Sequence, residues 1–203
     1  KYYITPFLTL SVIIGILLGG HWMFLGLVVI FVVIISGDAF FGEDTSQPDY
    51  SYPFFLELPL HMAVPSIILL LFVFAWSSGS KEQDFMNLGK LLAQFFSYDF
   101  LAERSKNMLI DYIGALFGVG YMVAGYATNV GHELSHRTKD KLALIEGRWL
   151  LSASLNSDFS IEHVYNHHVN VGTERDPATA KRGENVYAFF VRSTFMGHLS
   201  AWR

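Results

Sequence analysis

Residues 4–36 read ITPFLTLSVIIGILLGGHWMFLGLVVIFVVIIS and contain no Asp, Glu, Lys or Arg. A helix needs about 20 apolar residues to cross a bilayer, so this run is too long for one crossing and fits two short ones. Gly19-Gly20-His21 lies near its middle and is the natural place for a turn. The stretch therefore predicts a helical hairpin in a membrane, formed by residues 3–19 and 22–36.

Two further charge-free runs, residues 58–76 and 112–130, extend this pattern. The second contains Gly114 and Gly118, a spacing that lets helices approach closely. Only 16% of the 203 residues are charged and 52% are hydrophobic, whereas soluble domains are about 25% charged. We predict an all-α fold: an integral membrane helical bundle of four spans in one domain, residues 1–203, with residues 131–203 outside the spans. Four uncharged runs argue against the alternative of a soluble helical core.

The distribution of charge predicts which side of the membrane each segment occupies. Residues after Gly131 include nine Lys or Arg, residues 77–111 include four, and residues 37–57 include none but have five acids. Basic segments favour the cytoplasmic side, so we predict that residues 131–203 face the cytoplasm. The net charge of −4 gives no basic footprint for nucleic acid. The absence of cysteine excludes disulfides and thiolate metal sites.

Five of the eight histidines fall between positions 132 and 168. His132 and His136 are four residues apart, as are His163 and His167, and such pairs lie on one helix face and can grip one metal. His168 is about 100° further round a helix than His167, so we expect it to point elsewhere, toward a second metal. We predict that all five histidines are metal ligands and that together they bind two metal ions.

Other polar residues near these clusters are candidates to support them. Neighbouring carboxylates and amides orient ligand imidazoles in many metal sites; the candidates here are Glu133, Glu162, Asn166 and Asp176. We interpret His21 and His198 as structural. His61 has a better claim to function, because an ionisable group inside a predicted span is a functional candidate.

Two kinds of metal chemistry fit these residues. His132-Glu133-Leu134-Ser135-His136 matches H-E-x-x-H, in which Glu is the general base of a zinc protease, but an intramembrane protease has no need of the second cluster. Imidazole suits iron as well as zinc, and a non-haem centre of two irons could activate O2 to attack a C–H bond of an apolar substrate. A histidine-rich metal transporter is a non-enzymatic alternative, which requires polar residues along the spans.

Several motifs carry a family resemblance. They are Gly42-Glu43-Asp44, residues 129–137, residues 162–168, Asp176-Pro177-Ala178 followed by Arg182-Gly183-Glu184, and Ser200-Ala201-Trp202-Arg203. With them the chain resembles the membrane-bound alkane 1-monooxygenases and the xylene monooxygenase hydroxylase subunits. These belong to the wider histidine-box superfamily of desaturases and hydroxylases.

The resemblance implies an enzyme of the bacterial inner membrane with a diiron site on the cytoplasmic side. It implies hydroxylation of a hydrocarbon methyl group with O2 and two electrons from a rubredoxin- or ferredoxin-type donor and its reductase. By position, the first histidine box holds His132 and His136, and the second holds His163, His167 and His168. A fatty-acyl desaturase or hydroxylase is the alternative within the superfamily, and the run at residues 176–178 argues against it.

The chain also departs from the alkane hydroxylase pattern. Ser135 and Arg137 stand where those enzymes have Gly and Lys, and Val164-Tyr165-Asn166 is closer to the xylene-type second box. The substrate therefore stays open between a linear alkane and a methyl-substituted aromatic. The family's third histidine box and a further histidine have no counterpart here. We expect the chain to be an N-terminal portion, with the remaining metal ligands in a C-terminal half.

Overall fold

The computed structural model describes residues 3–42 and 52–202, and all regular structure in these ranges is helical. The chain divides into two compact units, Lys1–Tyr126 and Ala127–Arg203. Glu43, Asp44 and Arg203, which belong to the motifs quoted above, lie outside the described residues. The all-α prediction is confirmed for the part of the chain that the structure describes.

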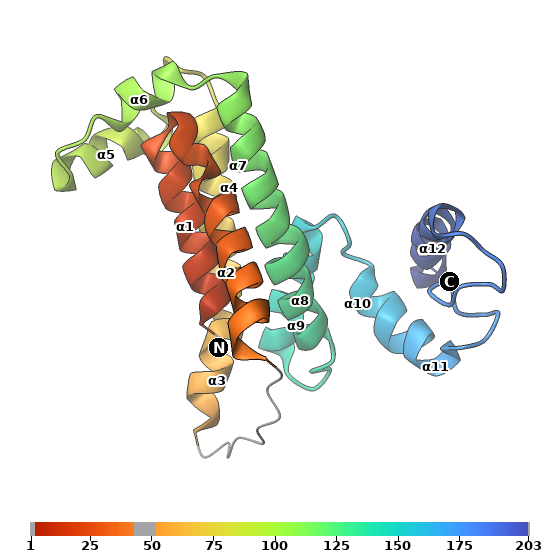
Figure 1. Ribbon diagram of the computed structural model, residues 1–203. Helices are drawn as coiled ribbons and strands as arrows, with labels where there is room; N and C mark the ends of the chain where they lie inside the picture. The colour runs from red at the N-terminus through yellow and green to blue at the C-terminus, as the bar shows by residue number, and fades with distance from the viewer. Residues whose placement is uncertain (1–2, 43–51, 203) are drawn as a thin grey trace. The chain divides into compact units, whose positions relative to one another are not determined.

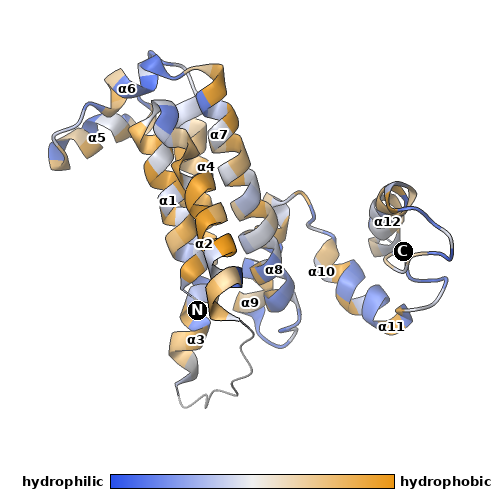
Figure 2. Cartoon of the chain, in the orientation of Figure 1, coloured by the Kyte–Doolittle hydropathy of each residue, from blue (hydrophilic) through white to orange (hydrophobic). Residues whose placement is uncertain are grey.

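The first unit contains the apolar helices. They are α1 (Ile4–Leu18), α2 (Leu25–Phe41), α3 (Pro53–His61), α4 (Ala63–Ser78) and α7 (Leu109–Tyr121). The short helices α5 (Leu88–Phe95) and α6 (Phe100–Lys106) come before α7. Helices α1, α2, α4 and α7 lie side by side in Figure 1, and each contacts at least two of the others. Figure 2 shows apolar residues along nearly their whole length.

Three continuous helical stretches are long and apolar enough to cross a membrane: Gly20–Phe41, Phe54–Ser78 and Leu109–Ser135. They cover three of the four predicted spans. The first predicted span is the 15-residue helix Ile4–Leu18, shorter than the length of about 20 residues that a crossing usually needs. Many apolar side chains on α2, such as Phe31 and Ile35, remain exposed in the unit, as expected for a surface that faces lipid. A crossing by α1 and the single-domain organisation stay predictions.

The predicted turn between the first two helices is confirmed. Gly19 and Gly20 have φ angles of +73° and +53°, a left-handed conformation that glycine adopts without a Cβ clash. The backbone N–H of Gly20 donates to Asn107 Oδ1 at 2.7 Å. A 3-10 turn, Gly20–Phe24, then leads directly into α2.

Glycines set the spacing of the helices in the bundle. A Cβ on Gly26 of α2 would lie 2.4 Å from Val12 Cγ2 and 2.6 Å from Val12 Cα on α1. A Cβ on Gly114 would lie 2.7 Å from the ring of Phe24. Gly26 therefore lets α1 and α2 approach closely, whereas Gly114 leaves room for the ring of Phe24 and Gly118 lies near Val12 and the backbone of Leu27.

The second unit contains α8 (Thr128–Ser135), α9 (Lys141–Ala153), α10 (Phe159–Glu162), α11 (His168–Asn170) and α12 (Val186–Ala201). Helices α8 and α9 pack through two facing glycines. A Cβ on Gly131 would lie 3.0 Å from the carbonyl oxygen of Gly147, and a Cβ on Gly147 would lie 3.1 Å from that of Gly131. This contact fixes the part of α8 that carries His132.

Candidate metal centre

The first histidine pair follows the helical geometry that the sequence predicts, with His132 in α8 and His136 as the residue that caps its C-terminal end. His132 and His136 are one helical turn apart, and their Nε2 atoms are 3.0 Å apart. The helix presents both imidazoles on one face because residues four apart are neighbours on an α-helix. This face meets the second histidine segment of the same unit, where the ring centroids of His132 and His163 are 4.4 Å apart.

The second segment does not follow α-helical geometry. Residues His163–His167 form a π-helical turn, and the backbone N–H of His168 bonds to the carbonyl of His163 five residues earlier. A π-turn brings residues five apart onto one side, so His168 aligns with His163. The expectation that His168 points away from His163 is wrong, because its Nε2 lies 3.0 Å from Nε2 of His163. Its role as a ligand of a second metal stays a prediction.

The two segments meet at His163, whose Nε2 is 2.7 Å from Nε2 of His132. Three ring nitrogens thus lie within 4.8 Å of one another, those of His132, His136 and His163, and Nε2 of His168 extends this set from His163. Nitrogen ligands at about 2.0–2.1 Å from one metal lie about 2.8–3.4 Å apart, depending on the coordination geometry. The observed separations fall close to this range, so the donor set fits a metal ion.

Electrostatics keep the central imidazole in the form that binds metal. Burial and the neighbouring imidazoles, His132 first, lower the pKa of His163 to about 4. His163 is therefore neutral at pH 7, and a neutral imidazole offers a lone pair to a metal. Phe159, four residues earlier, stacks on its ring with centroids 4.6 Å apart. Phe159 was not identified from the sequence, although its spacing of four from His163 places both on one helical face.

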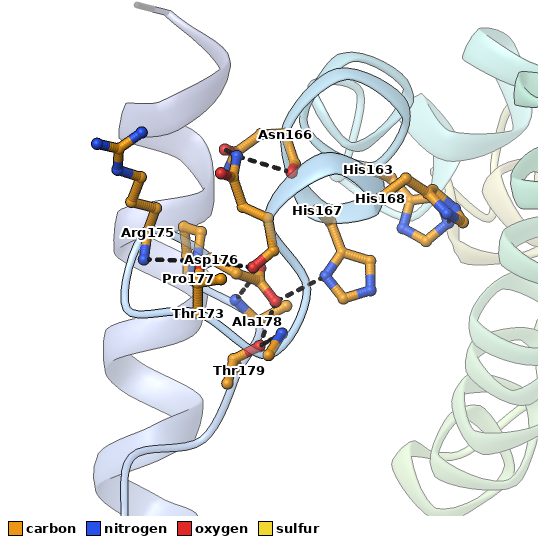
Figure 3. A network of polar contacts seen from close by, with 12 residues as sticks. His163, Asn166, His167, His168, Thr173, Arg175, Asp176, Pro177, Ala178 and Thr179 are labelled. Atoms are coloured by element: carbon orange, nitrogen blue, oxygen red, sulfur yellow. Dashed lines mark hydrogen bonds and ion pairs between the residues drawn. The ribbon is translucent and has the colours of Figure 1, made fainter.

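His167 turns toward a different partner. Its Nδ1 donates to Oδ2 of Asp176 at 3.0 Å (Figure 3), and the Asp176 side chain is fully buried. The ring stays beside the cluster, with centroids 5.2 Å from His163 and 5.7 Å from His168. Because an ionised carboxylate only accepts hydrogen bonds, this contact places the proton on Nδ1 and leaves Nε2 as the ligand atom.

Asp176 is held in its ionised form. Burial raises its pKa, but hydrogen bonds from Thr179, His167 and the backbone of Ala178 outweigh burial and hold the pKa below its ordinary value. Asp176 is thus the one of the four candidate supporting residues for which the structure gives a direct contact to a cluster histidine. Thr179 was not identified from the sequence, because nothing in its spacing marks it.

The other supporting candidates lie differently. Glu133 is largely exposed and pairs with Arg137 at 3.8 Å. Glu162 is buried, and one of its carboxylate oxygens accepts from Asn166 Nδ2 at 3.0 Å. Neither geometry includes a contact between these side chains and the converging nitrogens in the residues described. The contacts of Glu133 and Glu162 are with residues four positions later in their own segments, and not with the imidazoles.

Two of the remaining histidines each face an aspartate. His21 Nδ1 lies 3.1 Å from Oδ1 of the buried Asp111. His198 Nδ1, on α12, lies 2.5 Å from Oδ2 of Asp158 and ties α12 to the start of α10. These contacts agree with the structural role expected for both histidines.

The chain matches known proteins over most of its length. The fatty acid desaturase family matches residues 109–203. Alkane 1-monooxygenase 2 of Pseudomonas aeruginosa is 27% identical over 90% of this chain and 44% of its own length. Alkane 1-monooxygenase of Ectopseudomonas oleovorans is 28% identical over 81% of this chain and 36% of its own.

A relative with a different named substrate matches as well. The xylene/toluene monooxygenase hydroxylase component XylM of Pseudomonas putida is 26% identical over 96% of this chain and 46% of its own length. The chain thus spans less than half the length of these curated relatives. Together the matches confirm the resemblance: the chain is related to the membrane-bound alkane 1-monooxygenases and the xylene monooxygenase hydroxylase component, and its second half matches the fatty acid desaturase family.

Proposed function

We propose that this chain provides part of the histidine-bound iron centre of a membrane monooxygenase that hydroxylates a methyl group of a hydrocarbon. The observation that carries the proposal is the meeting of His132 and His136 with His163, three imidazoles that could hold one metal ion, beside which His168 lies with its Nε2 3.0 Å from that of His163. Imidazole ligands suit iron, zinc and copper, and the relatives named above are monooxygenases. Iron is therefore the metal that we propose.

In this proposal His132, His136, His163 and His168 bind metal through Nε2. His167 is the fifth ligand, with its proton held on Nδ1 by Asp176. When bound, two irons supply the oxidising chemistry by which O2, two electrons and two protons convert R–H to R–OH and water. Five imidazoles fill only part of the coordination of two metals, so we propose that further ligands come from sequence with no counterpart in these 203 residues.

The proposed setting follows from the apolar helices. Three stretches fit a bilayer, where a hydrocarbon substrate concentrates and from which it reaches the enzyme. We propose a bacterial inner membrane, with the histidines on the cytoplasmic side because nine basic residues follow Gly131. A rubredoxin- or ferredoxin-type protein and its reductase would deliver electrons from that side.

The geometry does not favour a zinc protease. Such an enzyme needs Glu133 beside the metal as general base, and Glu133 instead extends to Arg137. His132 and His136 also meet two further imidazoles, more nitrogen ligands than a zinc site with an open position requires.

Product analysis tests the proposed reaction. The chain, extended to its natural reading frame, would be supplied with a reductase system and either octane or p-xylene under 18O2. We expect a primary or benzylic alcohol that carries 18O. Alkene products without 18O would instead support a desaturase, and loss of the alcohol in a His132→Ala variant would tie the reaction to the cluster.

A further inference from the structure

The loop that holds Asp176 is itself closed by hydrogen bonds. Thr179 Oγ1 donates to Asp176 Oδ2 and accepts from the backbone N–H of Gly172 at 2.9 Å. The backbone N–H of Ala178 donates to the other carboxylate oxygen of Asp176 at 2.9 Å (Figure 3). These bonds fix where the carboxylate lies, and the carboxylate in turn contacts His167.

A single arginine from the last helix holds this loop from outside. Arg192 of α12 donates through Nη1 to the carbonyl of Pro177 and through Nη2 to the carbonyl of Thr179, both at 3.0 Å. These two carbonyls flank Ala178, the residue whose backbone N–H contacts Asp176. Arg192 therefore fixes the backbone on both sides of that contact.

The orientation of Arg192 is set by Glu184. The guanidinium forms a two-pronged contact with the carboxylate, Nε to Oε1 at 2.6 Å and Nη2 to Oε2 at 2.7 Å. The backbone N–H of Lys181 also donates to Glu184 Oε2 at 3.0 Å. Only arginine has the planar fork that serves a carboxylate and two carbonyls together.

We propose that the Glu184–Arg192 pair is a remote positioning device for His167. It acts through the carbonyls of Pro177 and Thr179 on Asp176, which holds the His167 proton on Nδ1 and leaves Nε2 as the ligand atom. The inference rests on the proposed metal centre for its purpose, but the position of the proton is a property of the protein without metal. Among the described residues, His167 Nε2 has no hydrogen-bond partner that would compete for it.

Substitution of Arg192 by lysine keeps the charge and removes the fork. Lysine has one nitrogen on a flexible stem, so it cannot hold Glu184 and both carbonyls in one geometry. We expect Asp176 to shift and His167 to exchange between its two neutral tautomers. Arg175→Lys is the matched control, because Arg175 lies beside Asp176 in sequence and its side chain points away from it (Figure 3).

The test uses the whole chain in detergent, labelled with 15N-histidine, at a pH where His167 is neutral. Imidazole 15N shifts report which nitrogen carries the proton, and His167→Ala assigns the signal. We expect one Nδ1–H tautomer in the metal-free parent and in Arg175→Lys, and a mixture in Arg192→Lys, Glu184→Gln and Asp176→Asn. Retention of Fe2+ against ferrozine should fall about 10-fold in the same three variants, as for other outer-shell partners.

The outcomes separate the two proposals. A parent-like His167 signal in folded Arg192→Lys and Glu184→Gln proteins overturns the positioning role. If the protein extended to its natural reading frame binds no Fe2+, the metal proposal fails, and the tautomer comparison still decides whether the pair acts on His167. If Arg192→Lys does not fold, as judged by circular dichroism and gel filtration, Glu184→Gln and Thr179→Val provide the same comparison.

Discussion

Removal of the His163 imidazole should weaken metal binding more than any single substitution outside the histidine cluster. His163 joins the two helical segments, since its Nε2 lies within 3.0 Å of Nε2 of both His132 and His168. The His163→Ala variant leaves only His132 and His136 of the three imidazoles that could hold one metal ion. It also removes the ring that stacks on Phe159.

The size of the effect follows from the number of ligands lost. Four-ligand zinc sites bind with about 10–16 kcal/mol, so one ligand contributes roughly 2.5–4 kcal/mol. Fe2+ binds more weakly than Zn2+ at such sites, which places the loss nearer 3 kcal/mol. Because 1.4 kcal/mol corresponds to a factor of ten, His163→Ala should release Fe2+ at about 100-fold lower chelator concentration.

The assay is chelator competition with Fe2+ in detergent, read by the absorbance of the ferrozine complex. His198→Ala is the matched control, because His198 contacts Asp158 and is not one of the converging nitrogens. Equal Fe2+ retention by His163→Ala and the parent would show that His163 does not bind the metal. An equal loss in His198→Ala would also contradict the prediction, because it would mean that any histidine removal acts through general destabilisation.

Two further predictions address the fold and the loop. Gly26→Ala should destabilise the bundle by about 1–3 kcal/mol because its Cβ would overlap Val12. Gly120→Ala is the control: its Cβ would have nothing within 4 Å, so it should be neutral or stabilise the bundle by up to about 1 kcal/mol. Titration with SDS measures the free energy of unfolding of both variants, and equal losses would contradict the packing at Gly26. Hydrogen bonds from Arg192 lower the pKa of Glu184 from 4.5 to about 2, so the pair stabilises the folded protein fully above pH 4.5 and progressively less as the pH falls to about 2. The difference in melting temperature between the metal-free parent and Glu184→Gln should shrink over this range, and a constant difference would argue against the ion pair.

The helices of the first unit were predictable because burial in lipid requires long apolar runs. The predicted span at residues 22–36 lies within the helical stretch Gly20–Phe41, and the one at residues 58–76 lies within Phe54–Ser78. The structure confirms both stretches as long and apolar. The turn at Gly19-Gly20 was also predictable, because two adjacent glycines lie near the middle of an apolar run that is too long for one crossing. The bounds of the helices were less predictable, since polar residues such as Asp38 continue α2 beyond the uncharged run.

The histidine site was predictable in composition but only partly in geometry. The pair His132 and His136 followed from α-helical spacing. The partner of His163 did not, because the π-turn replaces spacing four by spacing five and pairs it with His168 rather than His167. A π-turn and an α-helical turn can contain the same residue types. The sequence therefore does not distinguish them, and an α-helical spacing was expected.

Long-range polar contacts were the least accessible from the sequence. Asp176 was a candidate to orient an imidazole, but its partner His167 became known only from the folded loop. Arg192 was not a candidate at all, because it acts on backbone carbonyls 13 and 15 residues earlier. Backbone acceptors are the same in every residue, so no motif marks such a contact.

The most direct test of the proposed metal centre is elemental analysis of the protein, extended to its natural reading frame and purified in detergent. The proposal predicts about two irons per chain, lost in His132→Ala and His168→Ala variants. About one zinc and no iron would contradict it and favour a zinc enzyme.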